Sequence, residues 1–233
     1  DSSIPGAMNF DGPLPTNLKK FFEGTTFKGG KYNKDTAFVG YIAFNVKKMP
    51  CLQIRKAMYF ARNAKAIVDY KGGPTYNGGY VQSVVSPLNT VDYAPNGEWG
   101  PANPNWKPEG NVAYAQQLMD EAKTACPADY AKATTTGLVI DVRQSATLTD
   151  TVPINQAAWA RVGIKVSYNP IAAGYYPTVM NAAKQNDLST SGWSQDWPNA
   201  STVIPPLYTP EGGFDISQNT DDSIYAKFSA DVT

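Results

Sequence analysis

The feature that most constrains the fold is an alternation of helix-like and strand-like segments between residues 111 and 193. Apolar residues at helical spacing predict helices at 111–126, 152–163 and 175–186, and short β-rich runs predict strands at 137–142, 164–170 and 188–193. Strands that alternate with helices form a largely parallel sheet, because each crossover returns the chain to the same end of the sheet. The sequence therefore predicts an α/β fold, with a mixed, mostly parallel sheet flanked by helices.

The chain before this alternation is less regular. The aromatic run at 36–45 predicts a further strand, and residues 51–73 predict one or two helices. Residues 72–110 are rich in glycine and proline, which rules out regular helix there. Because this stretch is also rich in aromatic and apolar residues, we expect segment 81–100 to be an ordered loop packed on the α/β layer. Further helix-like segments lie at 18–24 and 221–233.

Composition removes several classes of function. Lys and Arg number 20, as do Asp and Glu, so the net charge is zero, which argues against a nucleic-acid partner. The chain has no histidine, which excludes a Ser-His-Asp triad, a Cys-His pair and a histidine-based zinc site. No apolar run is long enough to span a bilayer. The first residues have no signal-peptide pattern and both ends read as cut, so we expect a trimmed piece.

The chain has two cysteines, Cys51 and Cys126, at predicted helix boundaries. Two cysteines are too few for a cysteine-built metal site, and they form no CxxC motif, so we expect no metal and no cofactor. They are either two buried thiols or one structural disulfide. We predict that Cys51 and Cys126 form the disulfide, which an oxidising compartment would favour further.

The candidate site is the stretch "SGWSQDWPNA", residues 191–200. Asp196 lies between Trp193 and Trp197, just beyond the carboxyl end of the predicted strand at 188–193, where open α/β sheets bind ligands. Asp196 could cap the following helix or stabilise a turn. The interpretation we favour is that it pairs with a cationic ligand group, such as an amine, held against the aromatic rings.

A catalytic interpretation is weaker. A glycosidase needs two carboxylates facing each other across the scissile bond. Asp187 lies at the opposite end of the predicted strand, and Glu98 and Glu109 lie in the long loop with nothing in the sequence to bring them to Asp196. Arg55, near the start of a predicted helix, is interpreted as one half of a structural salt bridge.

The order of the segments resembles the family 5 extracellular solute-binding proteins of ABC importers for peptides, nickel and some sugars. "DLSTSGWSQDWPNAST" is similar to the family's Gly-Trp-x-x-Asp-aromatic signature, and "INQAAWARVGIKVSYNPI" resembles its amphipathic helix, strand and turn. "DDSIYAKFSADVT" resembles the helix that follows. The segment after the aromatic strand fits the family's hinge and helix at Phe44, Asn45, Lys47, Lys48, Pro50, Ile54, Arg55 and Ala57.

The resemblance implies a lobe of the type II periplasmic-binding-protein fold, truncated at both ends. Residues 1–40 would be the end of the first lobe and the hinge, and residues 41–233 an incomplete C-terminal ligand-binding lobe. It implies a monomeric, non-enzymatic component of an ABC importer. Its partners would be a small-molecule solute and a membrane permease. The solute would be a peptide or another small molecule, including a cationic one. It would be extracellular or periplasmic, anchored by a lipidated N-terminus that this chain lacks. The alternative is a secreted carbohydrate-active enzyme or carbohydrate-binding module.

The resemblance also assigns roles within the candidate site. Asp196 would hold the α-amino group of a peptide, with Trp193 and Trp197 as ligand-contacting rings. Gly192 and Ser194 would offer backbone groups to the ligand main chain. Some oligopeptide binders carry an arginine six residues before the aspartate, for the ligand's carboxylate; here that residue is Thr190, which leaves a non-peptide ligand open. Cys51 also departs from the family, which usually has an aromatic residue there.

Overall fold

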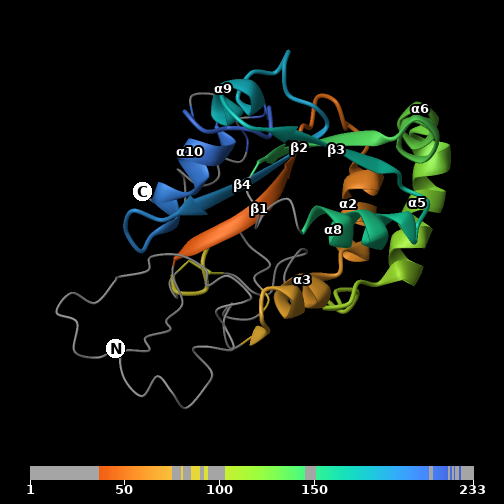
Figure 1. Ribbon diagram of the computed structural model, residues 1–233, viewed down its shortest axis with the longest axis horizontal. Coiled ribbons are helices and arrows are strands. Elements are labelled where there is room, and N and C mark those ends of the chain that lie inside the picture. Colours follow the sequence, from red (N-terminus) through yellow and green to blue (C-terminus); the bar gives the residue numbers. More distant parts are fainter. Residues whose placement is uncertain are drawn as a thin grey trace.

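A four-stranded mixed sheet forms the centre of the protein (Figure 1). The computed structural model describes residues 37–74, 80, 85–89, 92–93, 103–144, 151–209, 212–219, 221, 223 and 226. The strands lie in the order β1 (Phe38–Phe44), β4 (Leu188–Ser194), β2 (Leu138–Arg143) and β3 (Val166–Ile171). Strand β2 is parallel to β3 and β4, whereas β1 is antiparallel to β4. The predicted α/β fold with a mixed, mostly parallel sheet is confirmed.

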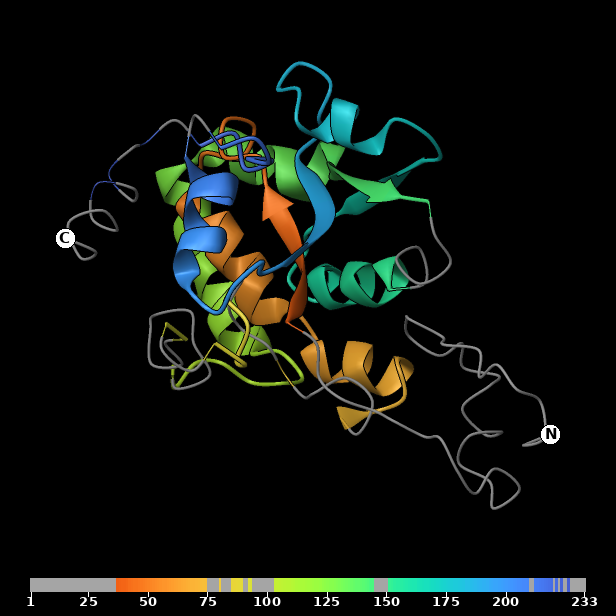
Figure 2. The same cartoon turned by 90° about the vertical axis from the view of Figure 1, so that its left-hand side faces the viewer.

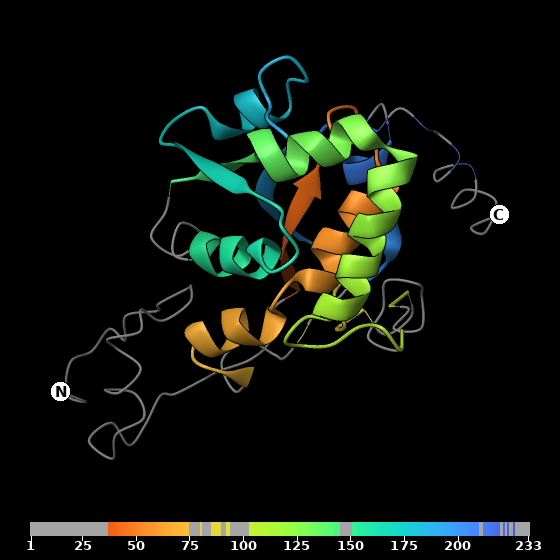
Figure 3. The same ribbon diagram turned by 90° about the vertical axis from the view of Figure 1, so that its right-hand side faces the viewer.

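One face of the sheet is covered by helices α2 (Leu52–Ala61), α5 (Val112–Ala125) and α8 (Val152–Ala160). In Figure 3, α5, in green, crosses in front of α2, in orange. The β2 residues that point to this face are apolar and nearly inaccessible, because side chains alternate across a strand. In β2 these residues are Leu138, Ile140 and Val142.

The other face carries two smaller apolar clusters. Helix α9 (Tyr175–Val179) packs there with Ile216, and helix α10 (Ile204–Tyr208) packs with Val85 and the preceding 3₁₀ turn η2 (Ala200–Thr202). Figure 2 shows α10, in blue, beside β1 and β4. Helices therefore pack on both faces of the sheet, although the edge strand β3 is largely exposed.

Most predicted helices exist, and their ends have local causes. Residues 51–73 form two helices, because the side chain of Asn63 accepts the N–H of Ala66 at 2.8 Å and starts α3 (Ala64–Tyr70). Asn111 caps α5 as predicted, and its side chain accepts the N–H of Tyr114 at 3.1 Å. The sequence did not predict α6 (Pro127–Ala131) or the π-helical turn η1 (Lys132–Thr136) after it.

The helix predicted at 175–186 is wrong in length, because α9 ends at Val179. The side chain of Asn181 accepts the N–H of Ala183 at 3.0 Å, and such a local bond competes with a helical one. The chain then turns so that Gln185 is fully buried. The helical spacing of this segment was real, but a polar side chain and an inward-facing residue ended the helix early.

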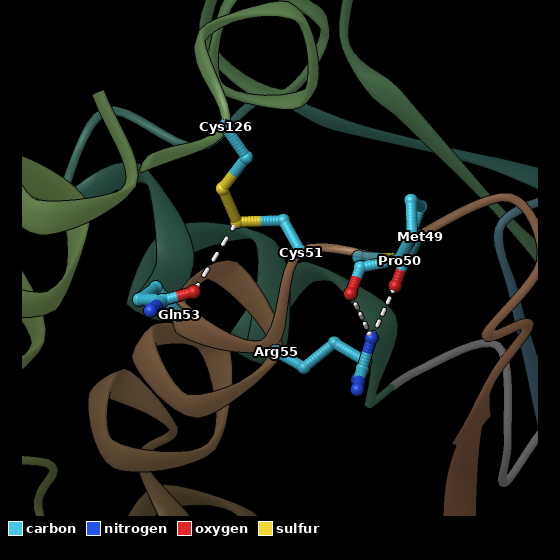
Figure 4. Close-up of a disulfide and its surroundings, with 6 residues drawn as sticks. All are labelled: Met49, Pro50, Cys51, Gln53, Arg55 and Cys126. Atoms are coloured by element: carbon cyan, nitrogen blue, oxygen red, sulfur yellow. Dashed lines mark hydrogen bonds between the residues drawn. A yellow bond between two sulfur atoms is a disulfide. The ribbon is translucent and has the colours of Figure 1, made fainter. Parts of the chain in front are cut away.

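The interpretation of Arg55 as a salt-bridge partner is also corrected. Its Nη1 donates to the carbonyl oxygens of Met49 and Pro50, so its described contacts are backbone carbonyls rather than a carboxylate (Figure 4). Burial lowers the pKa of the Arg55 guanidinium. Arg55 therefore fixes the segment that connects β1 to α2.

A second arginine, Arg161, makes a similar contact with backbone carbonyls at the C-terminal end of α2. Arg161 donates from Nη2 to the carbonyl oxygens of Ala61, at 2.7 Å, and Glu109, at 3.0 Å. Gly110 lies in the left-handed region with φ of 84°. A Cβ at Gly110 would lie 2.4 Å from the Ala61 carbonyl oxygen, so only glycine fits at this close approach.

A polar cluster anchors the start of β4. Asp187 is 6% exposed, and its carboxylate accepts from Lys132 Nζ and, at 2.9 Å, from the N–H of Val139. Asn45 donates from Nδ2 to Gln185 Oε1 at 3.0 Å, and its N–H donates to the Asp187 carbonyl at 2.9 Å. These bonds join β1, β2 and β4 at the end of the sheet where Phe44, Leu188 and Ile140 also pair.

Some predicted segments lie outside the described residues. These are the helix-like segment at 18–24, most of the loop at 81–100 and most of the segment at 221–233. In the described part of the loop, Val85 is buried and Tyr93 packs beside it against the α10 cluster. None of the helices in the described part of the chain has the length and apolar character needed to cross a bilayer.

Candidate functional site

The candidate site lies where the carboxyl end of β4 meets the start of β1. Phe38 pairs with Ser194, and Gly40 pairs with Gly192, so two glycines lie side by side on the α2 face of the sheet. The ring of Phe38 lies over Gly192, since a Cβ built there would be 2.1 Å from Phe38 Cζ. Phe38 is 57% exposed. The backbone of Gly192 is thus covered by one partly exposed aromatic ring.

Trp193 points to the opposite face of the sheet. Its indole Nε1 donates to the carbonyl oxygen of Thr202 at 2.8 Å, and its ring centroid lies 5.0 Å from that of Phe214. It packs beside Tyr41 on the α10 cluster. Burial raises the pKa of Tyr41, although a hydrogen bond to Ser191 opposes the effect. Trp193 is therefore a half-buried wall with a fixed orientation.

Asp196 lies two residues beyond β4 and is exposed. Its N–H donates to Thr202 Oγ1 at 3.0 Å, and the Thr202 hydroxyl donates to Asp196 Oδ2 at 2.9 Å. Trp197 is 53% exposed, and its Nε1 donates to Ser201 Oγ at 3.0 Å. Asp196 can therefore stabilise the turn and still bind a ligand, because only one of its carboxylate oxygens, Oδ2, is bonded within the turn.

The sequence analysis missed the residues that hold this site. Ser201 and Thr202 belong to η2, which starts where the side chain of Asn199 accepts the N–H of Ser201 at 2.8 Å. Asp92 adds a long-range tie, since its Oδ2 accepts the N–H of Ala200 at 2.6 Å. The Asn-x-Ser pattern is a recognisable cap signal, but nothing local could reveal the contact with Asp92.

Two further residues complete the description. Gln195 Oε1 is buried, and within the described residues it has no hydrogen-bond partner. Thr190, where some oligopeptide binders carry arginine, is 6% exposed, and its hydroxyl lies 3.3 Å from the hydroxyl of Tyr175. The site therefore offers a carboxylate, aromatic rings and an unpaired acceptor, and Thr190 supplies no cation for a ligand carboxylate.

The structure pairs Cys51 and Cys126 in a disulfide between the start of α2 and the end of α5 (Figure 4). Their Cα atoms are 6.1 Å apart, within the range that the bond requires. Gln53 Oε1 lies 3.7 Å from the sulfur of Cys51. Potential ligand atoms of both cysteines and of Asp129 lie within 4.8 Å of one another, but the sulfurs are bonded to each other and offer no thiolate to a metal.

Comparisons with known proteins bear on the family and the fold of the chain. The model of the bacterial extracellular solute-binding proteins, family 5, middle region, matches residues 7–215. A search of curated proteins finds no match.

Solved structures share the fold. The murein tripeptide binding protein MppA of Escherichia coli has 19% identity and a TM-score of 0.68, and the match covers 94% of this chain and 40% of that one. OppA of Haemophilus influenzae, in complex with RPPGFSPFR, has 20% identity and a TM-score of 0.67, covering 92% of this chain and 39% of that one. NikA of Staphylococcus aureus, in complex with Ni(L-His)2, has 10% identity and a TM-score of 0.68, covering 94% and 43%. The chain spans about two-fifths of the length of these proteins.

Proposed function

Because the chain belongs to family 5 of the bacterial extracellular solute-binding proteins, we propose that it is the solute-binding component of an ABC importer. Its α/β fold is that of type II periplasmic binding proteins, and the family acts outside the cytoplasm. The proposed partners are a small solute and a membrane permease, and the proposed role involves no catalysis. A lipidated N-terminus is the proposed anchor at the membrane surface, and the proposed state is a monomer.

We propose a small peptide, or another solute with a free amine, as the ligand. The observation that supports this most is Asp196, an exposed carboxylate beside two oriented indoles at the carboxyl end of a parallel strand. An ammonium group would pair with the carboxylate and lie against an indole face. Gly192 and Ser194 would present backbone groups to the rest of the ligand. Relatives of the same fold have been solved with a nonapeptide and with a nickel–histidine complex.

The proposed arrangement of lobes explains how an exposed carboxylate could bind tightly. We propose that residues 1–40 end one lobe and form the hinge and that residues 41–233 belong to the C-terminal lobe. In water an ion pair at Asp196 would contribute only about 0–1 kcal/mol. Closure of a second lobe over the ligand would remove that water and strengthen the pair.

Calorimetry on the intact protein tests the proposal. We expect tri-alanine to bind, and Nα-acetyl-tri-alanine, which lacks the ammonium group, to bind more weakly. Asp196→Ala should weaken the peptide by about 2 kcal/mol or more, because a desolvated ammonium loses its partner. Asp120→Ala, which removes an exposed carboxylate from α5, is the matched control and should change nothing. Equal affinities for the Asp196→Ala and unmodified proteins would refute the role of Asp196.

A carbohydrate ligand is the second candidate, and Trp197 is the observation that favours it. Its indole is 53% exposed and hydrogen-bonded to Ser201, and such a ring can stack on a sugar. Titration with a cello-oligosaccharide, with and without Trp197→Ala, separates this candidate from a peptide ligand. A glycosidase is less well supported, since both oxygens of Asp187 are engaged by Lys132 and Val139 at the other end of β4.

A further inference from the structure

We infer that Thr202 is the positioning residue of the candidate site and that its hydroxyl fixes the direction of the Asp196 carboxylate. The inference rests on the proposed function, because it assigns Asp196 to a ligand. Its evidence, however, is a set of contacts in the protein itself.

The first contact pair involves the Thr202 hydroxyl, which acts as both acceptor and donor toward one residue. It accepts the N–H of Asp196 at 3.0 Å and donates its own proton to Asp196 Oδ2 at 2.9 Å. A hydroxyl has one proton, so once this proton is donated to Oδ2 the hydroxyl has no donor left for another group. The donor bond goes to an ionised oxygen, which makes it stronger than a bond between neutral groups. Backbone and carboxylate of Asp196 are thus fixed together.

A second contact comes from the Thr202 backbone. Its carbonyl oxygen accepts the indole N–H of Trp193 at 2.8 Å. The neighbouring Ser201 accepts the indole N–H of Trp197 at 3.0 Å. One short turn therefore holds all three proposed ligand-contacting side chains, each through a different atom. Such a turn orients the site before any ligand arrives.

The turn itself is held firmly enough to act in this way. Thr202 is 2% exposed, and Ala200, two residues before it, donates its N–H to Asp92. Val203, which follows, is 1% exposed in the α10 cluster. Thr202 is thus buried and firmly held, whereas the Asp196 carboxylate that it bonds is exposed. This is the arrangement expected if Thr202 acts on a ligand through Asp196.

The consequence is a division of labour between the two carboxylate oxygens. Thr202 occupies Oδ2, and within the described residues no hydrogen bond is made to Oδ1. Oδ1 is the oxygen left for a ligand ammonium. Without the hydroxyl, Asp196 would rotate among several rotamers, and binding would have to restrict that rotation.

Hydrogen exchange on the intact, ligand-free protein tests the geometry. Thr202→Val keeps the shape and the carbonyl but removes the hydroxyl, so the Asp196 amide should exchange about tenfold faster. The Trp193 indole N–H, which bonds the retained carbonyl, should exchange at its original rate. Thr202→Ser should restore the Asp196 amide. Thr209→Val is the matched control, because it removes another buried hydroxyl, bonded to Pro205 at 2.9 Å, without touching Asp196.

Binding of tri-alanine supplies the second readout. We expect Thr202→Val to weaken it about tenfold, and Thr202→Ser to bind like the original protein. If Thr202→Val changes neither exchange nor affinity, or if Thr209→Val has the same effect, the inference is wrong. If both the Asp196 amide and the Trp193 indole lose protection, Thr202 merely holds the turn together, and positioning is refuted. If the original protein does not bind tri-alanine, the peptide proposal fails, and the exchange data alone decide the role of Thr202.

Discussion

The ion pair between Lys132 and Asp187 allows a quantitative test of what holds β4, the strand that leads to the candidate site, in place. Asp187 is the residue before β4, and it is nearly buried, with a side chain 8% exposed. Its carboxylate also accepts the N–H of Val139 in β2, and its backbone N–H donates to the Val139 carbonyl at 3.1 Å. The side chain of Lys132 is 37% exposed. We therefore predict that Lys132→Met leaves a poorly solvated carboxylate without its cation.

The magnitude follows from the exposures. Removing one partner of a fully buried pair costs about 3–5 kcal/mol. Water already reaches the Lys132 side of this pair, so we expect about 2 kcal/mol for Lys132→Met. Asp187→Asn keeps an acceptor for Val139 and leaves a lysine that can turn to solvent, so we expect about 1 kcal/mol. The double variant should cost clearly less than the sum, because neither charge is then left alone.

Urea unfolding followed by tryptophan fluorescence measures these differences. With a slope of about 2–3 kcal/mol per M, Lys132→Met should lower the midpoint by about 1 M. Lys65→Met, which breaks the exposed Lys65–Asp69 pair on α3, is the matched control and should shift the midpoint little. Strictly additive losses in the double variant would contradict a direct interaction between the two charges.

Three further predictions concern contacts that stabilise the fold. Gly110→Ala should destabilise the protein by several kcal/mol in urea, because its Cβ would lie 2.4 Å from a carbonyl oxygen of α2 and φ is 84°; a loss below about 1 kcal/mol would show that the segment relaxes freely. Replacing both Cys51 and Cys126 with alanine should lower the free energy of unfolding by about 2–4 kcal/mol, because the disulfide spans 75 residues. A reductant should lower the stability of the original protein by the same amount, and no effect of the reductant would mean that the thiols are free. Burial raises the pKa of Tyr59 and of Tyr175 to about 12, above the unfolded value of about 10. Their contribution to stability is therefore complete below about pH 10 and is lost as the pH rises toward about 12. Alkaline titration followed by tyrosinate absorbance and circular dichroism checks this, and full ionisation of all tyrosines near about pH 10 without unfolding would contradict it.

The sequence alone was sufficient wherever a feature depends on local pattern. The alternation of helical and strand spacing from residue 111 onward predicted the mixed α/β sheet, because periodicity reports which face of an element is buried. The caps were also legible, as Asn111 shows, since a cap bond joins residues three apart. The family followed from motif order and is confirmed by the match over residues 7–215.

Local pattern failed where a distant residue decided the outcome. The helical spacing after Tyr175 continued past Val179, but Gln185 is drawn into a buried cluster with Asn45, 140 residues away, and the helix stops. Arg55 has the same charge whether it meets a carboxylate or a carbonyl, so its partner could not be read from its position.

The candidate site divides along the same line. Sequence determined that Asp196 stands between two tryptophans beyond a strand, because these are statements about neighbours in the chain. Tertiary structure decided that Thr202 occupies one carboxylate oxygen and that Asp92 tethers the turn from 108 residues away. The physical reason is that hydrogen-bond partners are selected by the folded backbone, which brings donors and acceptors within 3 Å regardless of their separation in sequence.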